Sequence, residues 1–565
     1  MKIFFLIFIQ LLFLFNLKLY SQVKDSVSGI FLNNEVYFSF KIDENINLIK
    51  SLSNNFSIEK INENTVFAYS TKDNFLKLNE KLKNIKILQS EFANKNIPMA
   101  KSLKEVLSWN YYPTYSQYEQ LVSDFATSYP EICKLENIGQ TVNGRNIWVL
   151  KISDNVQIKE AEPEFLYSAT IHGNEPIGYV LSLRLIEYIL TNYTTNNEIA
   201  DLINNYEIWI NPLANPDGTY AIADSTINGA TRFNANGIDL NRNFPDPENG
   251  SNPDGESRQP ENIAMMDFVK QHNFVISAHL HTGSEVVNYP WDTWSKLHTD
   301  DIWFQKISHQ YADTAQLYSF NGYFDDYNDG ITNGYQWYEI NGGAQDYLTY
   351  FQNSRSITLE LSSTHLVDTS LLSNYWEYNY RSLINLIKNC NLGINGIVTD
   401  SLTGQPVKAE ITIIAHDFDN SFVISDSLNG DFYRPIMSGI YSILVTAPKY
   451  YSYQLDDVSI IENESKYFDI KLVPIQSKDS CNGIFYAQII NYPISDVLKI
   501  KIVNSNAKFM NVKIINSLGK ELFYNKLNSI CNTVIELNLG NLNDGIYYII
   551  LTQASKKIIA KYVKM

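Results

Sequence analysis

The middle of the chain alternates apolar runs with amphipathic segments. Four runs are apolar almost throughout, namely EFLYSATI (164–171), YEIWINPL (206–213), FVISAHLH (274–281) and SITLELSS (356–363). Strands that are buried on both faces have this composition. Segments with helical periodicity separate the runs. Over residues 109–392 we therefore expect an α/β domain, in which a mixed, mainly parallel sheet is flanked by helices.

The two ends of the chain follow other patterns. Residues 22–108 combine strand-like runs, such as EVYFSFKI and NTVFAYS, with a Lys-rich helical pattern over residues 74–88. This mixture predicts a small α+β domain. After Leu392, short alternating strands separated by Gly, Asn and Pro turns predict two all-β sandwiches, at residues 393–475 and 476–565. The segment 244–262 is rich in Pro, Gly and Asn and is expected to form a loop.

The first 21 residues have the form of a secretory signal peptide. Lys2 precedes an apolar run that ends near Phe15, and the small Ser21 offers a cleavage point. The run is shorter than the roughly 20 apolar residues that span a bilayer, and Gln10 interrupts it. We therefore expect an exported protein with no integral membrane span.

The net charge and the cysteine spacing each make one kind of ligand less expected, namely nucleic acid and a cysteine-bound zinc ion. The formal net charge of −17 argues against nucleic acid as a partner. No two of the four cysteines form a C-x-x-C pair, so a cysteine zinc site is not indicated. Export permits disulfides, and position along the chain suggests the pairs Cys133–Cys390 and Cys481–Cys531.

A possible metal site lies where the first apolar run ends. His172 and Glu175 occupy the turn between this run and a helical pattern. They could bind a metal, or Glu175 could simply cap the helix beside a surface histidine. A catalytic zinc ion needs a third protein ligand. His279 and His281 lie on a later strand and face the same side of it, so spacing alone does not choose between them.

Further polar residues converge on the same edge of the expected sheet. Arg232, Asn241 and Arg242 lie in one polar loop and could receive a carboxylate, although surface salt bridges are the alternative. Glu360 lies in the middle of an apolar strand, where a carboxylate is costly unless it is paired or functional. Ligands of open α/β sheets gather at the carboxyl ends of the strands.

Six motifs occur in a fixed order between about Tyr111 and Cys390. They are HGNEPIG, NPDG, FNANGIDLNRNFPD, HLHTGSEVVNYPWD, WYEINGGAQDY and TLELS. This part of the chain resembles the zinc metallocarboxypeptidases, in particular the regulatory branch that includes carboxypeptidases N, E and D. The resemblance implies one Zn²⁺ ion per chain, held by His172, Glu175 and His281. It makes His279 structural, because the family ligand lies eight residues before the tyrosine of NYP.

The resemblance also implies catalytic and substrate-binding roles. Glu360 matches the general base, and Arg232 matches the arginine that polarises the scissile carbonyl. The implied substrate-binding residues are Asn241 and Arg242 for the terminal carboxylate, Tyr338 as the mobile tyrosine, and Asp292 and Gln345 for a Lys or Arg side chain. Tyr350 is a rival for the tyrosine role, but the family tyrosine precedes the Gly-Gly pair. A turn-capping role is the alternative for Asp292.

The flanking domains carry weaker resemblances. Residues 393–474 resemble the transthyretin-like sandwich of the same branch, and we assign no chemistry to them; His416 is expected on a surface strand. The last unit resembles the C-terminal sorting domain of type IX secretion substrates, with an adhesive sandwich as the rival. Residues 22–108 are expected to be a pro-segment-like domain that covers the active-site cleft.

Taken together, these patterns predict a secreted or cell-surface zinc metallocarboxypeptidase. Its partners would be the C-termini of peptides or proteins, with a preference for Lys or Arg, and the secretion machinery. One alternative is a non-catalytic peptide- or surface-binding protein on a peptidase scaffold. Another is an amidase or carboxypeptidase that acts on peptidoglycan peptides.

Overall fold

The structure is a computed structural model that describes most of residues 33–564. The gaps are residues 42–55, 63, 80–81, 83, 94, 321, 476–485, 490–496, 504–508, 517, 529–532, 539–541, 543–544 and 554–555. The expected signal peptide at residues 1–21, Cys481 and Cys531 lie outside the described residues. Within the described residues, no helix is long and apolar enough to cross a membrane.

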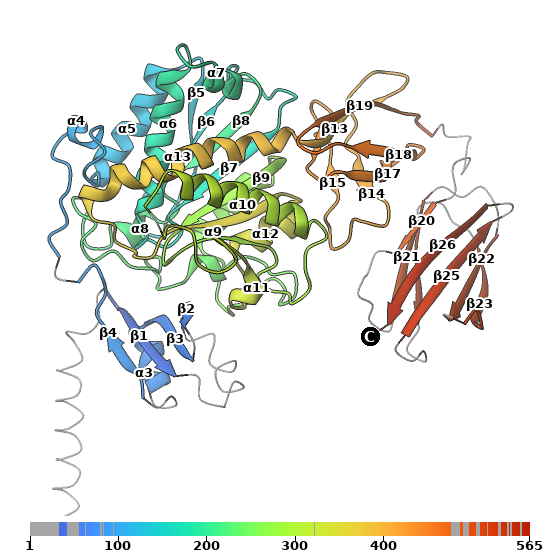
Figure 1. The fold of residues 1–565 in the computed structure, drawn as a ribbon, viewed down its shortest axis with the longest axis horizontal. Helices are drawn as coiled ribbons and strands as arrows, with labels where there is room; N and C mark the ends of the chain where they lie inside the picture. Colours follow the sequence, from blue (N-terminus) through green and yellow to red (C-terminus); the bar gives the residue numbers. More distant parts are fainter. Residues whose placement is uncertain are drawn as a thin grey trace, which may run out of the picture.

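An eight-stranded mixed sheet forms the centre of the largest domain (Figure 1). Its strands are β5 (Cys133–Gln140), β6 (Asn146–Ile152), β7 (Glu164–Ala169), β8 (Glu207–Asn211), β9 (Phe274–His281), β10 (Ser284–Tyr289), β11 (Ile331–Asn333) and β12 (Arg355–Ser362). Their order is β11-β10-β12-β9-β7-β8-β6-β5. The central neighbours β12, β9, β7 and β8 run parallel, and antiparallel pairs flank them. The predicted mixed sheet is thus confirmed, and every residue of these four central strands is buried.

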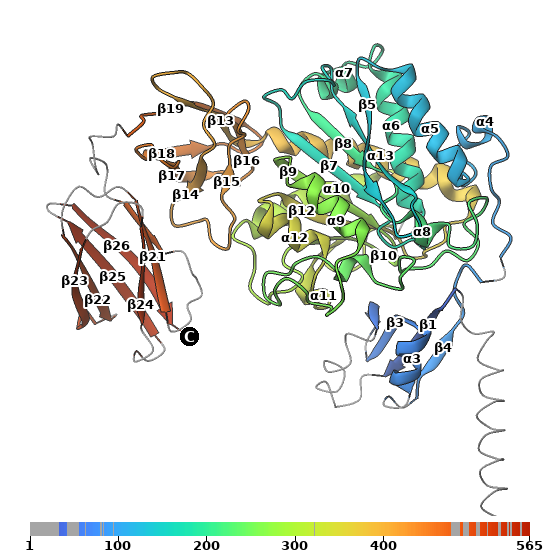
Figure 2. The ribbon, with the colours of Figure 1, turned by 180° about the vertical axis from the view of Figure 1, so that it is seen from behind.

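Helices cover both faces of this sheet (Figures 1 and 2). One face carries α5 (Tyr115–Ser128), α6 (Ile177–Asn192), α10 (Asp301–Leu317) and α13 (Leu372–Lys388), whose apolar residues share one core with the strands. The opposite face carries α9 (Pro260–Val269) and α12 (Ala344–Phe351), which enclose a second core. The remaining short helices of the domain are α4 (Leu103–Val106), α7 (Asn197–Ile203), α8 (Pro216–Thr219), η2 (Leu240–Arg242), α11 (Gly334–Trp337), η3 (Thr369–Leu371) and η4 (Asn389–Asn391). The expected loop at 244–262 ends earlier than predicted, because Pro260 begins α9.

The N-terminal domain has a four-stranded sheet of order β2-β3-β1-β4. Its elements are β1 (Glu35–Lys41), β2 (Ser57–Asn62), β3 (Thr65–Thr71), α3 (Lys72–Asn79) and β4 (Lys86–Leu88). The helix predicted over 74–88 is too long: it ends at Asn79, and Lys86–Leu88 pairs with β1 instead. The domain has its own apolar core, whereas Phe92 and the residues that follow pack into the core of the largest domain. It therefore forms a separate body on the larger domain.

The C-terminal part consists of two all-β units, as predicted. The first contains β13 (Gly393–Asp400), β14 (Glu410–Ile413), β15 (Val423–Ile424), β16 (Asp431–Arg434), β17 (Gly439–Thr446), β18 (Tyr453–Ile460) and β19 (Ser465–Leu472). These strands form two sheets around one core. The second contains β20 (Tyr486–Ile489), β21 (Val497–Val503), β22 (Phe509–Asn516), β23 (Glu521–Asn528), β24 (Thr533–Asn538), β25 (Gly545–Gln553) and β26 (Lys556–Lys564), again in two sheets.

Two expectations about single residues are wrong. Cys133 and Cys390 are both buried as free thiols, so they do not form the suggested disulfide. His416 lies in a turn after β14 and not on a surface strand. Its Nε2 bonds Asp300 Oδ1 at 2.8 Å across the junction between the large domain and the first sandwich. The histidine therefore belongs to an interdomain contact.

Candidate metal centre and active site

Two neighbouring parallel strands place the predicted metal ligands at one edge of the sheet. β7 ends at Ala169, and His172 follows in the turn that leads to α6. β9 pairs with β7 in parallel and ends at His281. Because parallel strands end at the same edge, the two histidines meet there, and their ring centroids are 4.8 Å apart.

Glu175 lies between the two imidazole rings. Its Oε1 is 2.8 Å from His172 Nδ1, and its Oε2 is 2.9 Å from His281 Nδ1. One ligand atom from each of the three residues lies within 4.8 Å of the others, and all three residues are buried. Two imidazole nitrogens and a carboxylate are the donor set of a catalytic zinc site that keeps a position open.

Asp239 and Arg232 surround this triad. The other ring nitrogen of His172, Nε2, is 3.2 Å from Asp239 Oδ1. A carboxylate in this position fixes the tautomer of a metal-binding histidine and orients its ring. Arg232 Nε donates to Asp239 Oδ2 at 2.9 Å, and its guanidinium lies 3.7 Å from Glu175. The residues therefore fit a zinc ion both in their donors and in the groups that support them.

Glu360 faces the same place from the next strand. β12 pairs in parallel with β9, and Glu360 is directly opposite His281. Its side chain is buried, and Oε2 has no hydrogen-bond partner among the described residues. Burial raises the pKa of Glu360 well above its usual value, the charge of Glu175 raises it further, and Arg232 opposes the rise. An unpartnered carboxylate oxygen beside the triad is free to bond a water molecule.

His279, the rival ligand, is not part of the triad. It is fully buried two residues before His281, opposite Ser168 of β7. Burial lowers the pKa of His279 to about 3, so the ring is neutral. The geometry thus brings His281, and not His279, to the other two ligands.

Asn241 and Arg242 lie in η2 and are held against the Gly342–Gly343 segment. Asn241 Oδ1 accepts a hydrogen bond from the Ala344 N–H at 2.9 Å. Gly342 has φ +75°, and a Cβ there would lie 2.3 Å from the Arg242 carbonyl oxygen. Only glycine fits such a close approach. The Gly-Gly pair therefore allows the loop to pack directly on the predicted carboxylate-binding residues.

Asp292 and Gln345 also meet, and both side chains are buried. Gln345 Nε2 and Asn288 Nδ2 each donate to Asp292 Oδ1 at 2.9 Å. The oxygens Gln345 Oε1 and Asn288 Oδ1 are buried, and no described residue forms a hydrogen bond with them. Burial raises the pKa of Asp292 to about 6, while hydrogen bonds and the charge of Arg242 oppose the shift. Two buried acceptor oxygens beside Asp292 are thus without a donor from the described residues.

Of the two candidate tyrosines, Tyr338 is the one near this site. It follows α11 directly. Burial raises its pKa above the usual value, and the charged groups that also affect this pKa are Arg242, Glu360, Arg232 and Asp292. The phenol is therefore neutral and can donate a hydrogen bond. Tyr350 packs instead against Trp294, with 5.5 Å between ring centroids.

Sequence reasoning missed two residues of the site. Asp239 belongs to the loop motif that supplies Asn241 and Arg242, yet nothing in that loop indicates which carboxylate reaches a histidine from another motif. The general need of a metal-bound imidazole for an acceptor could have suggested it. Asn288 lies in the NYPWD motif, four residues before Asp292. Its Nδ2 donates to Asp292 Oδ1, a contact that depends on how the chain turns after β10 and that the sequence does not indicate.

Comparison with known proteins gives two family matches. The model described as "Zinc carboxypeptidase" matches residues 118–382. The model described as "Secretion system C-terminal sorting domain" matches residues 492–565.

Several characterised proteins are similar over the same region. Carboxypeptidase D of Mus musculus is 37% identical over 354 residues, which cover 60% of this chain but only 25% of that protein. Carboxypeptidase M of Mus musculus is 35% identical and carboxypeptidase E of Caenorhabditis elegans 33% identical, with 78% and 83% of those proteins covered. The matches take in 59% and 61% of this chain, respectively. Among solved structures, carboxypeptidase A of Helicoverpa armigera aligns with a TM-score of 0.48 and 18% identity, covering 63% of this chain and 97% of that one.

Proposed function

Because the chain belongs to the zinc carboxypeptidase family, we propose that it hydrolyses the last peptide bond of peptides or proteins, with a preference for C-terminal Lys or Arg. The proposal is supported by the buried oxygens beside the triad and around Asp292 that have no hydrogen-bond partner in the described parts of the chain. Buried polar atoms in folded proteins are nearly always hydrogen-bonded. Those left without a partner at a site of this kind are explained by a water molecule and a substrate that supply the missing donors.

The residues of the centre divide the chemistry between them. His172, Glu175 and His281 would hold the zinc ion, which supplies Lewis acidity and makes water a nucleophile at neutral pH. Glu360 would accept the proton of the attacking water and pass it to the leaving amine. Arg232 would stabilise the negative charge that develops on the carbonyl oxygen, an effect of about 3 kcal/mol for a well-placed donor.

The loop residues would restrict the reaction to chain ends. Arg242 can bind a carboxylate through two parallel N–H bonds, and Asn241 lies beside it. In the middle of a peptide chain no carboxylate occupies the corresponding position. Tyr338 would close over the bound residue and donate its hydroxyl proton in a hydrogen bond. Exopeptidase action would therefore follow from a pair of residues that requires the carboxylate of a chain end.

The Asp292 pocket supports the preference for a basic last residue. A guanidinium group carries five N–H donors and no acceptor. The pocket offers the Asp292 carboxylate together with the free oxygens of Gln345 and Asn288. An apolar side chain would leave these oxygens unpaired, which costs about 1–3 kcal/mol for each buried group.

The terminal domains bear on where the protein acts. The match of residues 492–565 to a sorting domain indicates export through a secretion system. We infer that the substrates are met outside the cell or at its surface, after release or anchoring of this domain. The chain spans about a quarter of the length of the carboxypeptidase D relatives, so their substrates are not transferred to it. The sandwich at 393–475 is proposed to be transthyretin-like, without chemistry of its own.

Mass spectrometry of a peptide panel tests the proposal. The peptides end in Arg, Lys, Phe, Leu, Glu or D-Ala, and each is incubated with the zinc-loaded protein with and without a chelator. The proposal predicts loss of only the final Arg or Lys, and only without the chelator. Cleavage of the D-Ala peptide alone would indicate a cell-wall substrate. No cleavage by a protein that holds one zinc ion per chain would indicate a binding protein.

A further inference from the structure

A row of buried polar side chains crosses the central sheet two residues below the metal centre. Thr358 of β12, His279 of β9, Ser168 of β7 and Asn211 of β8 pair with one another in register on neighbouring parallel strands. None of the four is more than 7% exposed. Because side chains alternate along a strand, His279 lies on the same face of the sheet as His281. Buried polar groups in such a row need hydrogen-bond partners.

His279 is a member of this row with an unbonded nitrogen. Ser168 Oγ and Asn211 Oδ1 lie 3.1 Å apart and bond each other. No described residue forms a hydrogen bond with His279 Nε2, although the atom is buried. Asn262 of α9, the helix that packs on this face, has the same defect, because its buried Oδ1 has no partner in the described parts of the chain. Two residues on facing elements therefore each lack one hydrogen bond.

The two residues line one small cavity. Its volume is about 20 Å³, and its polar lining consists of His279, Asn262, Ser168 and Glu261, with apolar side chains around them. Every residue that lines it is buried. A water molecule needs roughly 10–15 Å³ of such volume and two to four polar partners. The cavity therefore has the room and the polar groups to hold one water molecule.

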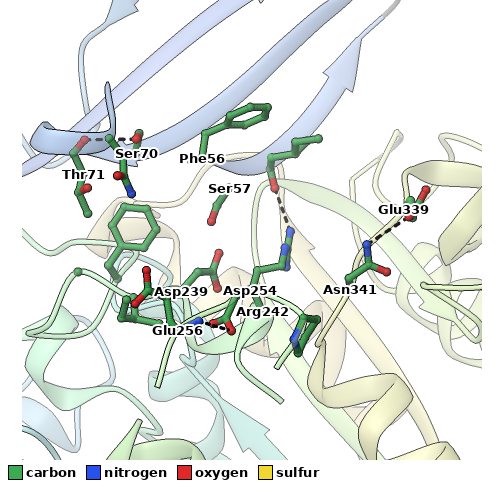
Figure 3. A pocket seen from close by; sticks show the side chains of 16 residues that line it. Phe56, Ser57, Ser70, Thr71, Asp239, Arg242, Asp254, Glu256, Glu339 and Asn341 are labelled. Atoms are coloured by element: carbon green, nitrogen blue, oxygen red, sulfur yellow. Dashed lines mark hydrogen bonds between the residues drawn. The ribbon is translucent and has the colours of Figure 1, made fainter. Parts of the chain in front are cut away.

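The loop that carries the predicted carboxylate-binding pair borders this cavity. Leu240 and Phe244 of the loop line it. Asp239 and Arg242 of the same loop line a different and larger cavity of about 140 Å³, in which Figure 3 shows both side chains. The loop thus borders both cavities, so that whatever occupies the smaller one supports the residues that line the larger one.

The first turn of α9 is bonded to this loop. Asn262 Nδ2 donates to the Leu240 carbonyl oxygen at 2.8 Å, and the Gln259 N–H donates to Asn243 Oδ1 at the same distance. A water molecule between Asn262 and His279 would extend these bonds to β9, the strand that ends at the zinc ligand His281. One line of hydrogen bonds would then join the carboxylate-binding loop to the strand that positions the metal.

We propose that one water molecule occupies the small cavity, bonded to His279 Nε2 and Asn262 Oδ1, and that His279 is thereby a positioning residue for the loop of Asn241 and Arg242. His279 would touch neither the metal nor the substrate. The inference rests on the proposed carboxypeptidase function, because it concerns where that loop holds a substrate carboxylate. Loss of the water would weaken binding of substrate and transition state alike, which raises KM and leaves kcat nearly unchanged.

A crystal structure of the zinc-loaded protein tests the water directly. We expect one ordered water molecule within about 3.2 Å of both His279 Nε2 and Asn262 Oδ1. In His279→Met, whose apolar side chain is of similar length but has no N–H group, that water should be absent. An empty cavity in a wild-type density map that shows buried water molecules elsewhere would overturn the proposal.

Kinetics and calorimetry test the positioning role. His279→Met should raise the KM for a peptide that ends in Arg, and the Kd of a guanidinoalkyl succinate, by about three- to tenfold, the usual effect of one hydrogen bond. The kcat should change less than about twofold. His279→Gln, whose amide nitrogen can replace Nε2, should restore both values. His272→Met makes the same change just before the start of β9 and should alter neither KM nor Kd. Unchanged KM and Kd in His279→Met would overturn the positioning role.

A double variant tests whether the two partners act through one water molecule. Asn262→Leu removes the second partner, so adding His279→Met to it should raise KM and Kd little further. Additive effects of the two substitutions would overturn the bridge. A protein that shows the water and the predicted changes in succinate affinity, yet cleaves no peptide, would retain this inference and lose the proposed function. A protein that cleaves the Arg peptide but has no water in the cavity would do the reverse.

Discussion

The metal centre and the junction between the large domain and the first sandwich both contain His, acidic and Arg side chains. The two clusters differ in how many of their acceptor oxygens are hydrogen-bonded. At the interdomain junction, Asp300 accepts from both Arg355 and Arg434, and His416 bonds its Oδ1. Asp417 is likewise bonded on both oxygens, by Arg434 and by the Ile413 N–H. The acceptor oxygens of these two aspartates are therefore all used.

The metal centre is assembled from similar residues but leaves oxygens free. Within the part of the chain that the structure describes, Glu360 Oε2 has no partner, and Gln345 Oε1 and Asn288 Oδ1 beside Asp292 are also unpaired. A carboxylate whose oxygens are all bonded can stabilise the fold but has no oxygen left for a ligand. An unsaturated one is costly for the folded protein and is useful only if a ligand completes it. The comparison suggests that removal of charge should cost stability at the junction and activity at the centre.

The largest expected effect is on catalysis. Glu360→Gln keeps the shape of the side chain but removes the proton acceptor, so kcat should fall about 10²- to 10⁴-fold, the usual contribution of a general base. Zinc content should stay at one per chain. Because the buried carboxylate has an unpaired oxygen, the free energy of unfolding should not decrease. A clear loss of stability, measured by urea denaturation, would contradict the comparison.

The matching change at the junction is Asp300→Ala. It leaves Arg355 and Arg434 buried without their shared partner, and breaking such a pair costs about 3–5 kcal/mol. Urea denaturation should show this loss, whereas kcat/KM per folded, zinc-loaded molecule should be unchanged. Asp267→Ala, at an exposed ion pair on α9, is the control and should cost less than about 1 kcal/mol. Unchanged stability in Asp300→Ala would remove the contrast between the clusters.

A smaller and more selective effect is expected in the substrate pocket. Asp292→Ala should lower kcat/KM about 10- to 100-fold for a peptide that ends in Arg, as expected when a buried charged hydrogen bond worth about 1.5–3 kcal/mol is lost. The loss for the same peptide ending in Leu should be much smaller. Equal losses on both peptides would show that Asp292 only caps its turn.

The pH dependence sharpens the same point. Burial raises the pKa of Asp292 from the usual aspartate value to about 6, so its charge is complete only well above that pH. The ratio of kcat/KM for the Arg peptide to that for the Leu peptide should therefore rise as pH increases from about 5 to 7. Groups common to both reactions cancel in the ratio. In Asp292→Ala the ratio should be flat over this range.

Sequence patterns predicted the parts of this molecule that local chemistry determines. The four apolar runs became fully buried strands, and two of them bring His172 and His281 to one sheet edge. The parts that depend on distant contacts were missed. Lys86–Leu88 continues a helical pattern but pairs with β1, because the strand partner supplies backbone hydrogen bonds. Glu59 gave no signal in the sequence, because it lies at a bulge of β2 and pairs with His365, more than 300 residues away in the large domain.

The cysteine prediction failed for a related reason. Cys133 begins β5, and Cys390 lies in η4; both are buried among apolar side chains as free thiols. Export from the cell permits a disulfide, but neither export nor position along the chain shows that two thiols are close enough to form one. A buried thiol also packs well as a small apolar group.

One competition experiment tests the central claim most directly. Three peptides of equal length are mixed in equal amounts with the zinc-loaded protein. One ends in Arg with a free carboxylate, one ends in Arg amide, and one ends in Leu with a free carboxylate. The account predicts that mass spectrometry shows the first peptide shortened by one residue well before either of the others. Cleavage of the amide at the same rate, or of the Leu peptide at the same rate, would contradict it.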